Sequence, residues 1–248
     1  MEKPLITVIM PCYNSANTIR CAIDSVYAQT LPVSVLVIDD GSKDDLAGAL
    51  SPYMDRPDFR LLKNETNLGV AKSRMRGVRH AATPYVAFLD ADDWWAPEKL
   101  RVQYERMEET GAVLSSTARE LFDAAGRPVG RVIHLPEIID ARAILRTNHL
   151  NCSAVMVKRD VMLEFPMEHD DSHEDYISWI RIIRRYGWAL GIDEPYLKYR
   201  LSAGGKSRNK LKSARMNFMV YRYCGFSLLR SICCFISYAF WGVKKYYL

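Results

Sequence analysis

Short apolar runs that alternate with helical patterns constrain the fold of this 248-residue chain more than any other feature. The apolar runs are residues 5–10, 34–38, 85–89 and, more weakly, 59–62. Nearly continuous apolar sequence is typical of a strand covered on both faces of a parallel sheet. Helical patterns lie between the runs, at residues 16–29, 43–50 and 70–82. The alternation predicts an α/β fold with a mostly parallel sheet flanked by helices.

The later part of the chain continues this pattern less regularly. Ala96-Pro97-Glu98 places a proline at the first position of a helix that extends to about residue 109. Further elements are predicted as strands at 112–117 and 153–157, a short helix after Asp140, and a helix at 174–186.

Polar clusters follow the predicted strands at the points where they end. They are Pro11-Cys12-Tyr13-Asn14, Asp39-Asp40-Gly41-Ser42 and Asp90-Ala91-Asp92-Asp93. In open parallel sheets ligands bind beyond the carboxyl ends of the strands, so these clusters predict a binding site at one edge of the sheet. The chain contains neither a G-x-G-x-x-G fingerprint nor a P-loop, which argues against Rossmann cofactors and P-loop nucleotides.

The spacing of Asp90 and Asp92 suits a divalent cation. Mg²⁺ and Mn²⁺ are hard ions that take one or two carboxylates and complete their coordination with phosphate oxygens and water. Such an ion neutralises charge on a departing diphosphate. Taken alone, two aspartates at this spacing are weak evidence for a metal site, because an acidic turn or a helix cap explains them better.

Five motifs in a fixed order give the chain a specific resemblance to a known family. They are V-I-M-P-C-Y-N at 8–14, I-D-D-G-S at 38–42, N-L-G-V-A-K-S-R at 67–74, F-L-D-A-D-D at 88–93 and H-E-D-Y-I-S-W at 173–179. This order resembles glycosyltransferase family 2, whose members have the GT-A fold and invert the anomeric centre. The tail resembles bacterial members of the teichuronic-acid, exopolysaccharide and O-antigen type more loosely.

The resemblance implies a domain organisation and a donor-binding surface. Residues 1–205 would form the catalytic domain, with 1–93 binding the nucleotide and 94–205 the acceptor. Pro11, Tyr13 and Asn14 would line the nucleotide pocket, and Asp39 and Asp40 would accept hydrogen bonds from base or ribose. Uracil has one ring N–H to donate to a carboxylate, which favours a UDP-sugar. A turn at Gly41 with a helix cap at Ser42 would also explain these aspartates.

Basic residues of the 70–82 helix are candidates for contacts with base or phosphate. By resemblance these are Lys72 and Arg76, and a solvated helix face is the alternative. The family's usual A-R-N-x-G appears here as Ser73-Arg74-Met75-Arg76-Gly77. Which basic side chain points inward therefore stays open.

For the acidic segment, the resemblance makes Asp92 the main metal ligand. Asp90 would reach the ribose or assist at the metal, with Ala91 beside the nucleotide. Asp93 is expected to cap the next helix. Trp94 and Trp95 are expected to pack in the core beneath the site rather than stack on a sugar.

The predicted helix at 174 carries the candidate general base. An inverting transfer needs a base within reach of the acceptor hydroxyl. By resemblance that base is Asp175, and Glu174 is a supporting acceptor-site residue or a structural one. Trp179, one turn along the same face, would also belong to the acceptor site. Helix capping is the alternative role for the carboxylates.

Downstream, Arg200 and Ser207 would cover the diphosphate, with a structural role as the alternative for Arg200. The acidic loop before the helix, around Asp170, is expected to be mobile and solvated and to close over the donor. A second metal site is the alternative for this loop, because His169 and His173 flank it.

The chain's charge is divided unevenly. Glu194 is the last acidic residue, and eleven basic residues follow it. Residues 208–223 form a basic amphipathic pattern, and the apolar stretch 226–243 is interrupted by Arg230 and too short to span a membrane. We therefore predict that residues 206–248 form amphipathic helices in the cytoplasmic leaflet. The alternative is packing on the protein's own core or on a second subunit. Nucleic acid suits the aromatic and aliphatic content of this tail less well.

The cysteines show no C-x-x-C spacing, and no signal peptide is evident, so a cytoplasmic protein at the inner membrane face is expected. The predicted reaction is transfer of a sugar from a nucleoside diphosphate to a lipid-linked, polyprenyl-diphosphate glycan in bacterial surface polysaccharide synthesis, with Mn²⁺ or Mg²⁺ as cofactor. A sugar nucleotidyltransferase and a non-catalytic sugar-nucleotide-binding module are the alternatives. The first would want a Gly-rich basic loop after the first strand, and Asp175 argues against the second.

Overall fold

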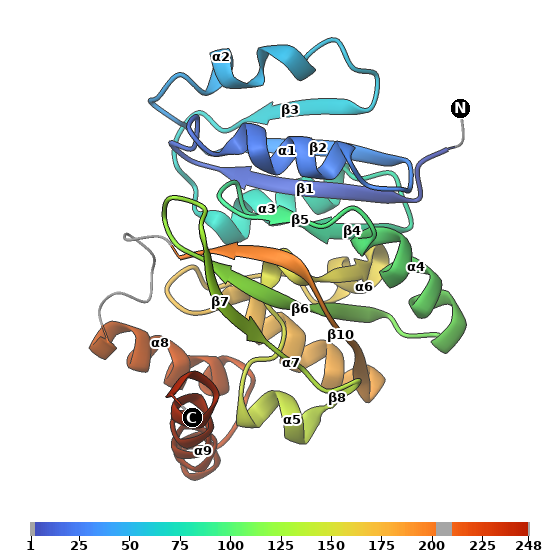
Figure 1. The fold of residues 1–248 in the computed structure, drawn as a ribbon. Helices are drawn as coiled ribbons and strands as arrows, with labels where there is room; N and C mark the ends of the chain where they lie inside the picture. Colours follow the sequence, from blue (N-terminus) through green and yellow to red (C-terminus); the bar gives the residue numbers. More distant parts are fainter. Residues whose placement is uncertain (1–2, 202–209, 248) are drawn as a thin grey trace.

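Four parallel strands form the first half of one continuous sheet. The computed structural model describes residues 3–201 and 210–247. Its strands follow the order β3-β2-β1-β4-β9-β6-β10-β5 (Figure 1). The parallel strands are β1 (Ile6–Cys12), β2 (Val33–Asp39), β3 (Phe59–Lys63) and β4 (Tyr85–Phe88). The predicted α/β fold is confirmed, and each predicted apolar run is a strand within about two residues of its expected bounds.

The second half of the sheet is mixed. Its strands are β5 (Trp94–Trp95), β6 (Leu114–Phe122), β7 (Pro128–Ile133), β8 (Ile138–Asp140), β9 (Met156–Lys158) and β10 (Trp188–Arg200). Strand β9 runs antiparallel to both β4 and β6, whereas β10 runs parallel to β6. Sequence patterns did not predict β7, β8 or β10, which are largely exposed at the sheet margin or interrupted by a register shift between Ile192 and Leu197.

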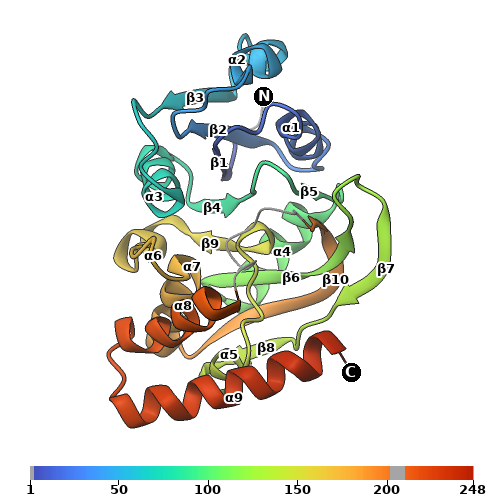
Figure 2. The same ribbon diagram turned by 90° about the vertical axis from the view of Figure 1, so that its left-hand side faces the viewer.

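Helices cover both faces of the sheet. They are α1 (Ile19–Tyr27), α2 (Leu46–Leu50), α3 (Val70–His80), α4 (Lys99–Thr110), α5 (Ala141–Arg146), α6 (Arg159–Glu164) and α7 (Glu174–Tyr186), with short 3₁₀ turns at Ser51–Tyr53 and Cys152–Ala154. Alternate residues of β1 point into separate cores, Ile9 toward α3 and α7, and Val8 and Met10 toward α1, α2 and α4. Figure 2 shows α3, α6 and α7 on one side of the strands and α1 on the other.

Gly77 sets how closely α3 approaches the sheet. A Cβ at this position would lie 2.5 Å from Cγ2 of Ile9 and 3.2 Å from Cδ1 of Ile38. Only a residue without a side chain allows the helix this close to β1 and β2. The glycine therefore determines how closely the later turns of α3 pack on β1 and β2.

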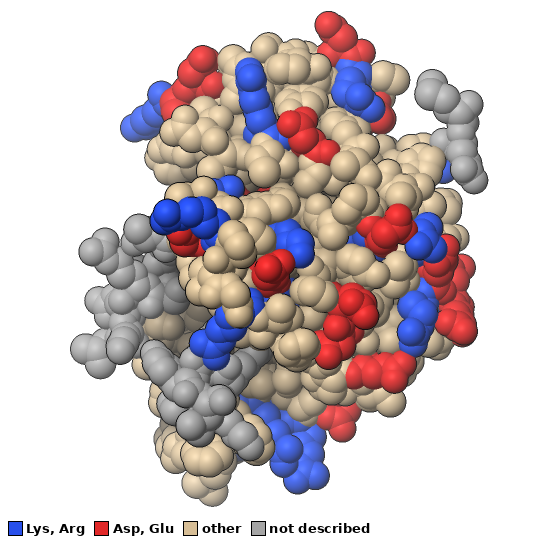
Figure 3. Space-filling view, in the orientation of Figure 1, with Lys and Arg blue, Asp and Glu red and all other residues tan. Residues whose placement is uncertain are grey.

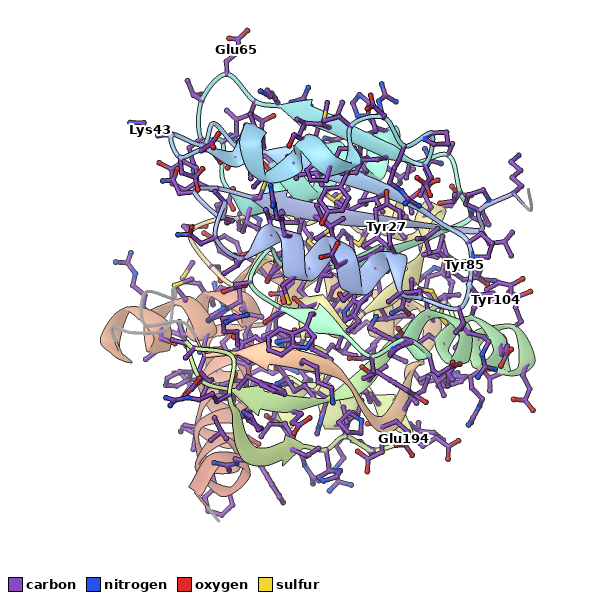
Figure 4. All side chains as sticks on the ribbon, turned by 45° about the horizontal axis from the view of Figure 1, so that its top comes forward. Tyr27, Lys43, Glu65, Tyr85, Tyr104 and Glu194 are labelled. Carbon is purple, nitrogen blue, oxygen red and sulfur yellow. The ribbon has the colours of Figure 1, made fainter. Side chains whose placement is uncertain are left out.

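The carboxyl ends of the parallel strands lie at one end of the molecule. Lys43 and Glu65, on the loops after β2 and β3, project outward there (Figure 4). Tyr85, the first residue of β4, lies at the opposite end, where its ring packs edge-on against Tyr104 of α4 at 5.6 Å. In Figure 3 basic and acidic side chains are interspersed over much of the visible face, with acidic ones more frequent toward the side of α4.

The C-terminal helices α8 (Lys210–Tyr223) and α9 (Leu228–Tyr247) pack against earlier helices of the chain, α8 on α7 and α9 on α5. Val220 and Tyr221 of α8 are buried in the core shared with α7. The ring centre of Tyr238 in α9 lies 5.9 Å from that of Tyr176, and the ring centre of Phe235 lies 6.1 Å from that of Phe218. Helix α9 runs along the edge of the molecule (Figure 2). The alternative expectation for the tail, packing on the protein's own core, accounts for these contacts.

Membrane-associating amphipathic helices are not confirmed by this packing. Within residues 3–201 and 210–247, no helix is long and apolar enough to cross a membrane. The predicted domain boundary at residues 205 and 206 lies outside the described residues.

Candidate active site

Two adjoining cavities lie at the carboxyl edge of the sheet, and Pro11 and Val70 line both. The smaller, of about 340 Å³, is lined by Pro11, Cys12, Tyr13, Asp40, Asn67, Gly69, Val70, Ser73 and Asp170. The larger, of about 630 Å³, is lined by Pro11, Asn14, Ser15, Asn17, Thr18, Val70, Arg74, Asp90, Ala91, Asp92, Ala124, Glu174 and Arg200. All three polar clusters that follow the strands thus contribute residues to one continuous site.

Asn14 ties the loop after β1 to the loop after β2. Its backbone N–H donates to the hydroxyl of Ser42 at 3.0 Å, and its side-chain oxygen accepts from the backbone N–H of Lys43 at 2.8 Å. Its φ of +52° lies in the left-handed region that asparagine tolerates better than most residues. Tyr13, immediately before it, is exposed at the smaller cavity, where a planar base could pack on its ring.

Asp40 shapes the loop that follows β3. Its carboxylate accepts from the backbone N–H groups of Leu68 at 2.9 Å and Gly69 at 3.0 Å, and from the side-chain amide of Asn64 at 2.7 Å. Asp39 accepts from the backbone N–H of Ser42 at 2.8 Å and lines neither cavity. The predicted turn is therefore present. Ser42 does not cap α2, because Asp45 accepts from the N–H of Gly48 in that role.

Arg74 is the basic residue of α3 that faces the site. Its side chain is 5% exposed, with Nη2 2.6 Å from Oδ1 of Asp90 and Nη1 2.9 Å from Oε1 of Glu174. Although burial opposes it, the negative charges of Asp90 and Glu174 hold the pKa of Arg74 well above its ordinary value. One guanidinium thus joins α3, the loop after β4 and the start of α7.

The expectation for Lys72 and Arg76 needs correction. Lys72 is exposed and lines neither cavity, while Arg76 is turned back toward the loop after β3, donating to the carbonyl of Lys63 at 2.7 Å and to Asn64. Helical spacing could have identified Arg74, because it shares a face with the apolar Ala71 and Val78. A charge on a buried face needs a partner.

Asp92 lines the larger cavity, and no other described residue hydrogen-bonds or ion-pairs with its carboxylate. Burial, followed by the charge of Asp90, raises the pKa of Asp92. A cation would relieve both effects. Among the described residues, no group of three or more His, Cys, Asp or Glu side chains is placed so that it could hold a metal ion. Two carboxylates nevertheless fit Mg²⁺ or Mn²⁺, which draw their other ligands from phosphate and water.

Asp93 does not cap the next helix as expected. It is 1% exposed and accepts from the backbone N–H of Arg200 at 2.9 Å, whereas α4 begins at Lys99. Burial and the charges of Asp90 and Asp92 raise the pKa of Asp93 well above its usual range. Trp95 is buried, with its indole N–H donating to the carbonyl of Ser153 at 2.7 Å, which confirms its packing role.

Arg200 closes one side of the larger cavity. Its Nε donates to the carbonyl of Asp92 at 2.9 Å and its Nη1 to the carbonyl of Ala124 at 3.1 Å. The guanidinium lies 5.0 Å from the ring centre of Trp94. Arg200 therefore lines the cavity and also hydrogen-bonds to the backbone of the acidic segment. The expected contact by Ser207 falls outside the described residues.

Helix α7 begins with Glu174 and Asp175. Glu174 is nearly buried and lines the larger cavity. Asp175 follows it and is partly exposed, with its Oδ1 accepting from the N–H of Tyr176 at 2.8 Å. Desolvation, followed by the charge of Glu174, raises the pKa of Asp175 to about 6, against the opposing charge of Arg74. A carboxyl group tuned this way can exchange protons near neutral pH.

Trp179 has a packing role, which corrects the expectation of an acceptor contact. Its side chain is 0% exposed, and its ring centre lies 6.4 Å from that of Phe88. A helical period of 3.6 places residues 175 and 179 on neighbouring parts of one surface. Of the described residues of α7, Glu174 lines the larger cavity, whereas Asp175 and Trp179 line neither. The tryptophan is directed into the core instead.

Comparisons with known proteins agree with this arrangement. Residues 7–163 match the family model described as glycosyl transferase family 2. The chain is 32% identical over 247 residues to a putative teichuronic acid biosynthesis glycosyltransferase, TuaG, of Bacillus subtilis, covering 98% of both chains. It is 30% identical over 250 residues to the Escherichia coli UDP-Glc:α-D-GlcNAc-diphosphoundecaprenol β-1,3-glucosyltransferase WfgD, covering 99% of this chain and 96% of WfgD.

A solved structure shares the fold. The mannosyltransferase PcManGT from Pyrobaculum calidifontis, in complex with GDP-Man and Mn²⁺, superposes with a TM-score of 0.73 at 18% identity, covering 98% of this chain and 71% of that one. The fold is therefore of the GT-A type, with a curled, mostly parallel sheet flanked by helices. On the family model and on the two relatives that align along nearly its whole length, this chain belongs to glycosyltransferase family 2.

Proposed function

We propose that this protein is a metal-dependent, inverting glycosyltransferase that transfers a sugar from a UDP-sugar to a lipid-linked glycan. The observation that carries the proposal is the pair of ion pairs made by Arg74, at 2.6 Å to Asp90 and 2.9 Å to Glu174. This bridge holds the acidic segment after β4 and the first turn of α7 on one cavity. A donor diphosphate and an acceptor hydroxyl could therefore meet between them.

Asp175 is the better of the two candidate bases on α7. Glu174 is committed to Arg74, and a carboxylate paired with a guanidinium is a weak proton acceptor. Asp175 has no such direct partner, and its pKa of about 6 suits a base that operates near neutral pH. In the proposed step Asp175 takes the proton of the acceptor hydroxyl. The acceptor oxygen bonds to the anomeric carbon as the bond to the diphosphate breaks on the opposite face.

The donor would lie across both cavities. Pro11 and Tyr13 would line the base and ribose, with Asp39 or Asp40 completing that end, while Asn14, Asp90 and Ala91 lie toward the diphosphate. Asp92, assisted by Asp90, would hold Mn²⁺ or Mg²⁺, which would neutralise charge on the leaving diphosphate. Arg200 would add positive charge at the same place. The name of WfgD specifies a UDP-sugar, whereas PcManGT was solved with GDP-Man. The nucleotide base of the donor is therefore measured directly with a panel of nucleotide sugars.

The name of a relative and the surface of the tail support the proposed acceptor and location. WfgD is named for a diphosphoundecaprenol-linked acceptor. The outer face of α9 exposes an apolar stripe made of Leu229 (74% exposed), Ile232 (40%), Ile236 (63%) and Phe240 (68%). Spacings of three and four place these residues on one helix face. The stripe and the basic tail suit peripheral binding to the anionic inner leaflet, where a polyprenyl-diphosphate acceptor would lie.

The experiment that tests the function uses the purified full chain with a panel of nucleotide sugars. Each donor is combined with an undecaprenyl-diphosphate-linked sugar, with and without Mn²⁺. We expect release of UDP that needs both metal and acceptor, and a product of inverted anomeric configuration by NMR. Donor binding without any turnover on this acceptor class would instead support the non-catalytic module. Pyrophosphate release from a nucleoside triphosphate and a sugar phosphate would support the nucleotidyltransferase.

A further inference from the structure

The loop of residues 167–173, which leads directly into α7, is held from two sides. On its inner side Asp170 reaches the start of α3, where Oδ1 accepts from the backbone N–H of Ala71 at 2.9 Å. The carboxylate occupies space that Gly69 leaves free, since a Cβ there would lie 2.5 Å from Oδ2 of Asp170. A carboxylate at a helix N-terminus also interacts favourably with the helix dipole.

On its outer side the loop is held by α8. The hydroxyl of Tyr223 donates to Oδ2 of Asp171 at 2.8 Å, and its ring stacks on that of His169 at 3.7 Å with planes 6° apart. The buried hydroxyl of Ser172 donates to the carbonyl of Met216 at 2.8 Å. Three contacts from two residues of α8, Met216 and Tyr223, thus hold one short loop.

The loop backbone is consistent with a conformation imposed from outside. His169 has a φ of +69°, in the left-handed region that non-glycine residues seldom adopt. Such a residue costs on the order of 1 kcal/mol and persists where its surroundings determine it. Here the stacking of the His169 ring on Tyr223 holds the residue in this conformation.

Helix α8 can hold the loop because it is itself anchored to α7. Arg181 donates to the carbonyl of Tyr223 at 3.0 Å, and Arg184 donates to the carbonyl of Cys224 at 2.7 Å. Tyr221 is buried against Tyr176, the residue after Asp175. The tail and the candidate catalytic helix therefore form one packed unit.

We propose that Tyr223 and Asp170 are positioning residues that hold the 167–173 loop in the conformation that presents Asp175 to the donor. Two contacts attach the loop and the start of α7 to α3, one between Asp170 and Ala71 and one between Glu174 and Arg74. Asp170 and Glu174 are only four residues apart in the chain. Tyr223 prevents the intervening residues from swinging outward. On this view the C-terminal tail is part of the catalytic apparatus as well as a candidate membrane anchor. This inference rests on the proposed transferase function for its kinetic consequence only.

The test compares substitutions at Tyr223 with a matched tyrosine elsewhere. Tyr186, near the end of α7, also directs its hydroxyl toward a surface carboxylate, Glu164, at 3.3 Å, but contacts neither the loop nor either cavity. The variants are Tyr223→Ala and Tyr223→Phe, with Tyr186→Ala and Tyr186→Phe as controls, all in the full chain. Asp170→Ala is measured alongside, and each variant is checked for folding by its thermal midpoint.

Hydrogen exchange of the loop amides gives a readout that does not depend on activity. The N–H of Ser172 donates to the carbonyl of His169 at 2.8 Å. Slow exchange of this N–H therefore reports that the loop keeps the conformation seen in the structure. We expect about tenfold faster exchange at residues 169–173 in Tyr223→Ala and Asp170→Ala, an intermediate value in Tyr223→Phe, which keeps the stack, and no change in the Tyr186 variants. Unchanged protection in Tyr223→Ala with normal folding would refute the inference.

Kinetics provide the second readout. Tyr223 lines neither cavity, so Tyr223→Ala should lower kcat about tenfold while the donor KM stays within about twofold. Asp170 lines the smaller cavity, so Asp170→Ala should change both constants. A loosened loop with an unchanged kcat in Tyr223→Ala would overturn the positioning role. If the unmodified chain transfers no sugar, the proposed function fails, and loop exchange alone decides whether Tyr223 and Asp170 hold the loop.

Discussion

The guanidinium of Arg74 lies 2.6 Å from the carboxylate of Asp90, and both side chains line the same cavity. This contact joins a residue of α3 to the acidic segment that follows β4, and Arg74 continues to Glu174 on α7. The buried guanidinium of Arg74 therefore holds three chain segments that carry separate motifs in fixed positions relative to one another. The candidate chemistry depends on those relative positions.

Replacing Arg74 tests this arrangement directly. Arg74→Met removes the guanidinium that pairs with Asp90 and Glu174, and breaking a buried ion pair costs about 3–5 kcal/mol. We expect a lower free energy of unfolding and a loss of at least about 100-fold in kcat/KM. Urea unfolding and initial rates measure the two effects. Lys72→Met on the exposed face of α3 is the matched control, and an equal loss in that variant would remove the special role of Arg74.

Asp175 should control the acid side of the pH profile. A general base works only when ionised, so activity should fall as pH drops through the pKa of about 6. We expect kcat/KM to decrease tenfold per pH unit below that value and Asp175→Asn to lose about 100-fold or more in kcat. Donor binding by calorimetry should persist in this variant. Asp55→Asn, an exposed position that lines neither cavity, serves as control, and a profile that keeps its acid limb in Asp175→Asn would exclude Asp175 as the titrating base.

Asp92 should carry the metal dependence. Its carboxylate faces the larger cavity without another described partner, so Asp92→Asn removes the main candidate ligand. We expect Mn²⁺ affinity in the presence of UDP to weaken about 10- to 100-fold and the stimulation of turnover by metal to disappear. Glu65→Gln, on an exposed loop at the same edge, should behave as the unmodified protein (Figure 4). Undiminished metal stimulation in Asp92→Asn would reassign the ligand.

Lys99 should leave a signature in stability. Its side chain is 0% exposed, its ammonium donates to Gln103 at 2.7 Å, and burial lowers the pKa of Lys99 well below its ordinary value. The folded state therefore disfavours the protonated form of Lys99, which lowers the free energy of unfolding at neutral pH. This loss of stability shrinks as pH rises toward about 10.4, the ordinary pKa of lysine, because the side chain then loses its proton in the unfolded chain as well. Relative to the unmodified protein, Lys99→Met should be more stable at pH 7 than at pH 10, with a trend of up to about 1.4 kcal/mol per pH unit.

Denaturant unfolding from pH 6 to pH 10 measures this difference. Lys43→Met replaces an exposed lysine and should show no such trend (Figure 4). Parallel pH curves for the unmodified protein and Lys99→Met would mean that Lys99 stays charged in the folded state.

The apolar stripe of α9 should bind membranes. Replacing Ile236 and Phe240 together by serine removes two exposed side chains that make up much of the stripe. We expect sedimentation with vesicles containing anionic lipid to fall about tenfold or more, because each large apolar side chain contributes about 1.5–3 kcal/mol when buried. Leu5→Ser with Met54→Ser, exposed residues far from α9 in the chain, is the control. Equal binding by both double variants would argue against α9 as the attachment surface.

Much of the site could be predicted because its signals are local. A strand covered on both faces must be apolar throughout, so the runs that became β1, β2 and β4 are visible without a structure. The polar residues that end such strands must lie at one edge, which brought Pro11, Asn14 and Asp92 together as expected. The order of the motifs identified the family for the same reason.

Other features depended on which side of an element meets its neighbour, and only the tertiary structure decided them. Arg74 rather than Lys72 or Arg76 enters the cavity because Arg74 lies on the face of α3 that is buried against its neighbours. Trp179 is directed into the core, and α8 packs on α7, where Tyr223 reaches the loop before Asp175. Sequence periodicity shows that a helix has an apolar face, but the partner of that face is a long-range contact. Residues 44 or more positions apart, such as Ser172 and Met216, meet only once the chain has folded.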